Sequence, residues 1–325
     1  VNDLPQPTAV HWHGIRIENA MDGAAPLTQA PVPPGEWFDY DFVAPDPGTY
    51  WYHSHSGLQE QSGLYGPIII DPASADPVSY DREYVLVLSD WLFEHPHKVY
   101  AKLKKNNEVF NMQERTLGDF IRDASDKGLG GTIEDRAMWG NMRMSATDIA
   151  DVTGAVYTYL INGHSTEDNW TALFETGERI RLRLINTANA RIFRLSFKGH
   201  RPWLAAIDGH AIPPRRFDEG QLIIAPGSRA DLIIDMDGTP GERYSVIDNS
   251  PEGIRYRLAD LAYGSAPSSA RAERPAPTAW APNPLPEPDM TNPTRLSLDM
   301  EGGAMGGHHD GGDVWAFNGS SGQQA

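Results

Sequence analysis

The stretch TAVHWHGIRI at residues 8–17 alternates β-branched and aromatic residues with small or polar ones, which is typical of a β-strand. A second stretch, GTYWYHSH at residues 48–55, has the same character. Between them, PPGEWFDYDFVAPDPG at residues 33–48 predicts a turn, a further strand and a Pro-Gly turn. We therefore expect residues 1–75 to form part of one β-sandwich domain whose first strands are missing.

A second sandwich is predicted for residues 80–263, because strand patterns recur there between Gly and Pro turns. Residues 95–150 interrupt these patterns with a charged segment that predicts short inserted helices. Residues 264–293 are rich in Pro, Ala and Ser and predict an extended linker. Residues 294–325 then predict the start of a third, truncated domain.

The composition excludes several classes of protein. The formal net charge is −17, from 44 acidic and 27 basic residues, so nucleic acid and anionic membranes are not expected as partners. No apolar stretch reaches the length of about 18 residues that a membrane span needs. The chain has no cysteine, which excludes disulfides, thiol catalysis and a copper–thiolate site within these residues.

Two histidine pairs stand out, His11 with His13 and His53 with His55. Alternate residues of a strand share one face, so neighbouring strands would bring four imidazoles together. Four imidazoles without a thiolate favour copper or zinc. The alternative is that these histidines are structural and pack against the nearby aromatic residues.

Several motifs resemble multicopper oxidases, the laccase and ascorbate oxidase superfamily. The resemblance covers nearly all of residues 1–262 and is closest to the copper-resistance protein A type. The motifs that carry it are HWHG (11–14), MDG (21–23), LTQAPVPPG (27–35), PGTYWYHSH (47–55), SGLYGPIII (62–70), DREYVLVLSDW (81–91) and YTYLINGHSTEDNW (157–170).

This resemblance implies an all-β fold of tandem cupredoxin-like Greek-key β-sandwiches, with short helical insertions in the second. In the family, a trinuclear copper cluster between the first and third domains reduces O₂ to water, and a type 1 copper in the third domain takes electrons from the substrate. By resemblance, His11 would bind the type 2 copper, and His13, His53 and His55 the type 3 pair. Asp22 would support proton delivery, although Asp-Gly is also simply a turn.

Half of the family's cluster is missing from the sequence. The family uses eight histidines and a His-Cys-His motif, whereas this chain supplies four of the histidines and no cysteine. We therefore expect the first two domains of a three-domain oxidase that acts on Cu(I) or phenols in copper tolerance, periplasmic or exported, with the fragment itself inactive.

Three alternatives stay open. One is a non-catalytic copper-binding protein that sequesters the metal. Another is a two-domain copper enzyme of the nitrite reductase type, against which the absence of cysteine argues. The third concerns the second domain alone, which would serve only as a structural spacer.

Other segments have weaker signals. Thioether and imidazole groups suit Cu(I), but packing and linker roles explain the same residues, namely Met138, Met142, Met144, Met305, His308 and His309. His95 and His97 predict a solvated loop rather than a site. The arginines within residues 179–183 and 215–216 are predicted to alternate along strand edges rather than to form a patch.

Overall fold

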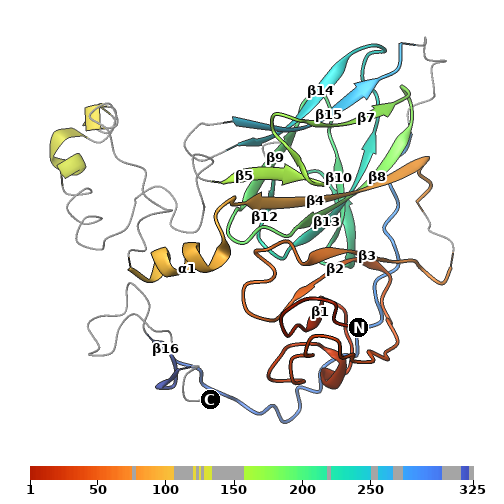
Figure 1. Ribbon diagram of the computed structural model, residues 1–325. Helices are drawn as coiled ribbons and strands as arrows, with labels where there is room; N and C mark the ends of the chain where they lie inside the picture. The colour runs from red at the N-terminus through yellow and green to blue at the C-terminus, as the bar shows by residue number, and fades with distance from the viewer. Residues whose placement is uncertain are drawn as a thin grey trace. The chain divides into compact units, whose positions relative to one another are not determined.

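The computed structural model describes residues 1–74, 78–105, 120–121, 124–125, 128–133, 157–217, 221–249, 255–265, 274–301 and 316–321. The chain divides into two compact units. The first unit comprises Val1–Asn111 and Ala150–Pro284, and the second comprises Met112–Ile149 and Leu285–Ala325. Figure 1 shows that the described part of the first unit consists mainly of strands. Among the described residues, no helix is both long and apolar enough to cross a membrane.

A three-stranded antiparallel sheet occupies the N-terminal part of the first unit. Its order is β1 (Val10–His13), β2 (Gly48–Ser54) and β3 (Tyr65–Ile70), and a short 3₁₀ turn, η1 (Asn19–Met21), follows β1. In the register of β1 and β2, His11 lies opposite His53. The two histidine-bearing strands are therefore neighbours, as predicted.

Two further sheets face each other across one apolar core. The seven-stranded sheet has the order β11-β10-β13-β8-β4-β5-β6, and the five-stranded sheet has the order β12-β9-β14-β15-β7. Their bounds are β4 (Arg82–Trp91), β5 (Thr158–Ile161), β6 (His164–Ser165), β7 (Trp170–Phe174), β8 (Arg179–Asn186), β9 (Phe193–Phe197), β10 (Trp203–Ile207), β11 (His210–Arg215), β12 (Gln221–Ile224), β13 (Arg229–Asp235), β14 (Arg243–Asn249) and β15 (Arg255–Tyr263).

The core forms because alternate apolar residues of both sheets point inward. Leu182 and Leu184 of β8 pack in one cluster with Phe193 and Leu195 of β9, and all four are fully buried. Helix α1 (Pro96–Lys105) follows β4 and is one of the predicted helical insertions. The prediction of an all-β fold with few helices is confirmed. In the second unit, β16 (Met300–Glu301), β17 (Ala316–Phe317) and β18 (Ser320–Ser321) form a small sheet.

The strand predicted between residues 36 and 43 is not part of any described sheet. Its side chains still alternate: Tyr40 and Phe42 lie within 5.4 Å of the Trp12 ring, measured between ring centroids, whereas Trp37 and Val43 are exposed. The prediction was wrong because alternation reports only which side chains face the core. Membership of a sheet also needs a backbone neighbour, and no described strand lies in hydrogen-bonding register with this segment.

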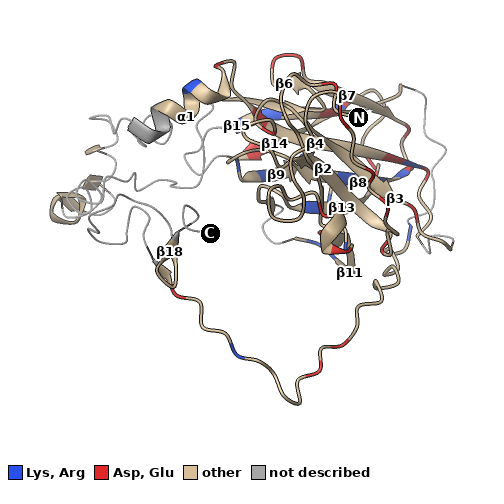
Figure 2. Ribbon diagram, turned by 60° about the horizontal axis from the view of Figure 1, so that its bottom comes forward, with Lys and Arg blue, Asp and Glu red and all other residues tan. Residues whose placement is uncertain are grey.

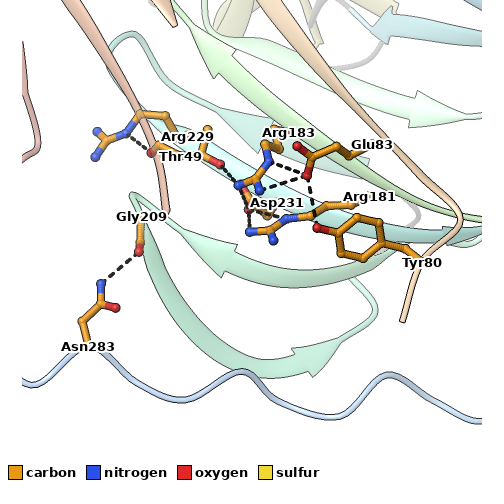
Figure 3. A network of polar contacts seen from close by, with 9 residues as sticks. All are labelled: Thr49, Tyr80, Glu83, Arg181, Arg183, Gly209, Arg229, Asp231 and Asn283. Atoms are coloured by element: carbon orange, nitrogen blue, oxygen red, sulfur yellow. Dashed lines mark hydrogen bonds and ion pairs between the residues drawn. The ribbon is translucent and has the colours of Figure 1, made fainter. Parts of the chain in front are cut away.

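A network of ion pairs inside the second sandwich is connected to the N-terminal sheet by a hydrogen bond to Thr49 (Figure 3). Arg183 of β8 donates to Glu83 at 3.0 Å, to Asp231 of β13 at 3.3 Å and to the Thr49 hydroxyl of β2 at 2.9 Å. Arg181 also pairs with Asp231, at 2.5 Å. The prediction of an edge position was wrong for the arginines within residues 179–183, since β8 runs between β13 and β4 inside its sheet, whereas Arg215 lies on β11 at the edge of that sheet. More generally, acidic and basic positions are interspersed over the strands and loops of the first unit (Figure 2).

Part of the predicted linker is bound to the first unit. We call residues 274–284 the strap. Arg274 pairs with Asp81 at 2.6 Å, and the Trp280 ring lies 4.2 Å from the guanidinium carbon of Arg181. Asn283 donates to the Gly209 carbonyl at 3.1 Å (Figure 3). The strap has no helix or strand, as expected of a Pro-rich segment, but side chains at both of its ends are anchored.

Candidate metal centre

The histidine cluster, defined as His11, His13, His53 and His55, lies on one face of the β1–β2 pair. His11 lies directly opposite His53, and His55 continues the pairing because its N–H donates to the Ala9 carbonyl at 3.1 Å. The ring centroid of His11 lies 5.2 Å from that of His53, 5.7 Å from that of His13 and 5.8 Å from that of His55. The structure therefore brings together the four residues that the sequence pattern singled out.

Oxygen acceptors lie behind three of the four rings. The Nδ1 atom of His11 lies 2.8 Å from the Asp22 carbonyl, that of His53 lies 3.0 Å from the Ser54 carbonyl, and that of His55 lies 3.3 Å from the Ala25 carbonyl. An acceptor at Nδ1 requires the proton there, which leaves the lone pair on Nε2. These three rings therefore offer Nε2 as the ligand atom.

His13 is arranged differently. Its Nδ1 atom lies 3.3 Å from Nε2 of His53, whereas the Cε1 edge of the ring faces Gly227, at 3.2 Å from where a Cβ on that glycine would lie. His13 thus turns Nδ1 toward the other histidines. Trp51 supports both rings, with centroids 4.8 Å from His13 and 4.5 Å from His53.

The cluster fits a transition metal ion. One ligand atom each from His11, His13 and His53 lies within 4.8 Å of the others. Two nitrogens that share a metal at about 2.0 Å in tetrahedral geometry lie about 3.3 Å apart, which matches the 3.3 Å between Nδ1 of His13 and Nε2 of His53. Imidazole ligands with carboxylate and carbonyl groups behind them are the usual construction of such a site.

The second sandwich shapes the electrostatics of His13. Burial lowers the pKa of His13 to about 3, and the Arg229 guanidinium adds to that effect. Arg229 begins β13 and is buried, with hydrogen bonds to the Gly227 carbonyl at 2.9 Å and the Thr49 carbonyl at 3.3 Å. His13 is therefore neutral over the physiological pH range, as a metal ligand must be.

The pKa of His53 is shifted in the opposite direction from that of His13. Burial opposes its protonation, but the hydrogen bond and charge of Glu60, together with the Ser54 carbonyl, outweigh burial, and the pKa of His53 is raised. The Glu60 carboxylate lies 3.2 Å from Nδ1 of His53.

Asp22 lies beside the cluster, at the end of η1. Its carboxylate Oδ1 is 3.4 Å from Nδ1 of His11, and its side chain is 28% exposed. It therefore contacts both solvent and the back of one ring. A proton-delivery role for Asp22 stays a prediction.

Among the described residues, His95 and His97 form a pair of their own. His95 and His97 stack with centroids 5.5 Å apart at the start of α1, so His97 is helical rather than in the predicted loop, although both are exposed. The imidazole Nδ1 of His95 accepts the N–H of His97, which explains the pair as a helix start. The Met- and His-bearing positions 138, 142, 144, 305, 308 and 309 fall outside the described residues.

Sequence reasoning did not identify two residues that lie against the histidine cluster, Arg229 and Glu60. Arg229 lies in a turn-and-strand segment, APGSRADL, that carries no metal-binding pattern. Glu60 lies five residues after the second histidine pair, in a segment with ordinary turn composition. Only the three-dimensional contacts single them out.

Two models of the multicopper oxidase family match the chain, one over residues 1–75 and the other over residues 134–262. The chain therefore belongs to the multicopper oxidases, oxidoreductases whose cofactor is copper. Within that family it is of the copper-resistance type, as its relatives show.

Copper resistance protein A of Escherichia coli is 39% identical over 98% of this chain and 51% of its own length. Copper resistance protein A of Pseudomonas syringae pv. tomato is 42% identical over 80% of this chain and 42% of its own length. Among solved structures, a multi-copper oxidase from Pseudomonas thermotolerans has 28% identity and a TM-score of 0.65, covering 93% of this chain and 60% of that one. The chain thus spans about half the length of these curated relatives.

Proposed function

We propose that this chain supplies one half of a trinuclear copper site in a protein that couples one-electron oxidation of a substrate to the four-electron reduction of O₂ to water. The single observation that supports this most is the convergence of His11, His13 and His53 ligand atoms within 4.8 Å. Family membership supports copper as the metal, and these residues contain no cysteine that could serve as the thiolate ligand of a type 1 copper.

The copper that each histidine would hold follows the family resemblance, and the ligand atom follows from the side on which each ring nitrogen lies. His11 would hold the type 2 copper through Nε2. His13 through Nδ1, and His53 and His55 through Nε2, would hold the type 3 pair. Copper bound there would supply one-electron chemistry toward O₂. Asp22 would deliver protons, because its carboxylate is both solvent-accessible and next to His11.

We also propose the physiological setting. The copper-resistance relatives favour copper tolerance in the periplasm or another exported location, with Cu(I) or a phenol as the reducing substrate. A third domain carrying the other histidines and a His-Cys-His motif would be the partner of the histidine cluster.

Oxygen uptake tests the proposal. The protein expressed from its whole gene, loaded with copper, should consume O₂ when a phenol or Cu(I) is added, and His53→Ala should abolish this uptake. Copper bound at the cluster without any O₂ consumption would contradict the oxidase and favour the sequestering alternative. The 325-residue chain alone should bind copper weakly and consume no O₂.

A further inference from the structure

Two of the histidines have a carboxylate as well as a carbonyl behind the ring. His11 has Asp22, with Nδ1 to Oδ1 at 3.4 Å, and His53 has Glu60, with Nδ1 to Oε2 at 3.2 Å. The acid behind His11 lies in a motif of the first domain, MDG. Glu60, the acid behind His53, has no role in the proposed function, yet it lies closer to its histidine than Asp22 does to His11.

The loop that carries Glu60 is fixed in place by its neighbour. The Gln59 side chain accepts hydrogen bonds from the hydroxyls of Thr8 and Ser54, both at 2.7 Å, and donates to the Pro7 carbonyl at 2.9 Å. The Gly63 N–H donates to the Glu60 carbonyl at 2.9 Å and closes the turn before β3. These hydrogen bonds therefore hold the backbone of the turn that carries Glu60.

The contact also orients the ring. Nδ1 of His53 has two acceptors, Glu60 and the Ser54 carbonyl at 3.0 Å, and both require the proton on that atom. A charged acceptor forms a hydrogen bond roughly twice as strong as a neutral one. The Nε2 atom that remains lies 3.3 Å from Nδ1 of His13, toward the centre of the cluster.

We propose that Glu60 is the positioning residue of His53: its carboxylate holds the Nδ1–H of that ring and so presents Nε2 to the metal. This inference rests on the proposed copper function of the cluster. Partners behind a ligating histidine fix its tautomer and raise its basicity, and their removal costs about 10- to 100-fold in metal affinity. Because the Ser54 carbonyl remains, we expect a loss at the lower end of that range.

Two measurements on the 325-residue chain test the proposal. The first needs no metal: long-range ¹H–¹⁵N NMR of ¹⁵N-histidine-labelled protein reports the tautomer of each ring. His53 should be almost entirely Nδ1–H in the wild type and in Glu60→Gln, whose amide oxygen still accepts, and a mixture of tautomers in Glu60→Ala. The second is Cu²⁺ affinity by competition with a chelator, which should fall about tenfold in Glu60→Ala and less in Glu60→Gln.

The matched control is Glu36→Ala, since Glu36 is an exposed glutamate of the same part of the chain. It should change neither the His53 tautomer nor the copper affinity. A Glu60→Ala protein with wild-type tautomer and wild-type copper affinity would overturn the proposal while leaving the copper function intact. If the wild type itself bound no copper at the histidine cluster, the proposed function would fail, and the tautomer measurement would still decide whether Glu60 orients His53.

Discussion

Gly14, the residue after the first histidine pair, shows how closely the N-terminal sheet approaches the second sandwich beside the histidine cluster. Its φ of +84° is unfavourable for other residues, and a Cβ there would lie 2.2 Å from Nη2 of Arg229. Arg229 is buried and bonded to Gly227 and Thr49, so it has little room to move. A side chain at position 14 would therefore push β1 away from the second sandwich.

We expect Gly14→Ala to lower the free energy of unfolding by about 2–4 kcal/mol, from backbone strain plus the clash with Arg229. Urea unfolding measures this. Gly35→Ala is the matched control, because Gly35 has a φ of +78° and no atom within 4 Å of its Cβ position. In Gly35→Ala the free energy of unfolding should fall only by the cost of the backbone strain, about 1 kcal/mol. Equal losses at the two positions would show that the contact with Arg229 does not matter.

At the scale of elements, β14 and β15 are held together by the buried carboxylate of Asp260. It accepts hydrogen bonds from Ser245 at 3.1 Å and from Arg243 at 3.0 Å, and pairs with Arg257. Burial works against ionisation, but these donors outweigh it and the pKa of Asp260 is lowered from 3.8. The ionised form of Asp260 therefore stabilises the fold at pH values above its pKa in the unfolded state. This contribution is lost as the pH falls through its lower pKa in the folded state.

Asp260→Asn should accordingly destabilise the chain by about 1 kcal/mol at pH 7, a modest value because both arginines are half exposed and screened by water. The difference from wild type should shrink as the pH is lowered below 3.8. Denaturant titrations at pH 7 and pH 3 measure it, with the exposed Asp41→Asn as control. A difference independent of pH would mean that the charge of Asp260 contributes nothing.

The strap is a second element whose role can be isolated. Trp280 stacks on Arg181 and packs against Val78, Ala205 and Ile233. We expect Trp280→Ala to cost about 1–3 kcal/mol in stability, from the lost cation–π and apolar contacts. It should also make residues 274–284 susceptible to proteolysis. Trp37→Ala, at a tryptophan that is 66% exposed, should do neither. Unchanged protection of the strap in Trp280→Ala would show that other contacts anchor it.

At the scale of the whole molecule, the all-β fold and the meeting of the two histidine pairs could be predicted from the sequence. Both depend on local periodicity: His11 and His13 share a face because the side chains of a strand alternate. The contacts of Arg183 with Thr49 and of Arg229 with Gly14 could not be predicted, because they join residues far apart in the chain. The same holds for Glu60, whose carboxylate reaches His53 only because the turn before β3 folds back.

The second sandwich contributes to the surroundings of the histidine cluster. It places the guanidinium of Arg229 next to His13, helps to lower the pKa of that ring, and bonds to β2 through Thr49. The histidine cluster thus lies on the N-terminal sheet and contacts residues of the second sandwich. The domain limits at residues 75, 80 and 263, and a third domain beginning near residue 294, stay predictions.

The most direct test of the central claim is a crystal of this chain soaked with a copper salt and measured at the copper absorption edge. We expect one anomalous peak at Nε2 of His11 and another between Nδ1 of His13 and Nε2 of His53, with both peaks lost in the His11→Ala, His53→Ala double variant. A chain that shows no peak at these atoms, or binds copper only at other histidines such as His95 and His97, would contradict the account.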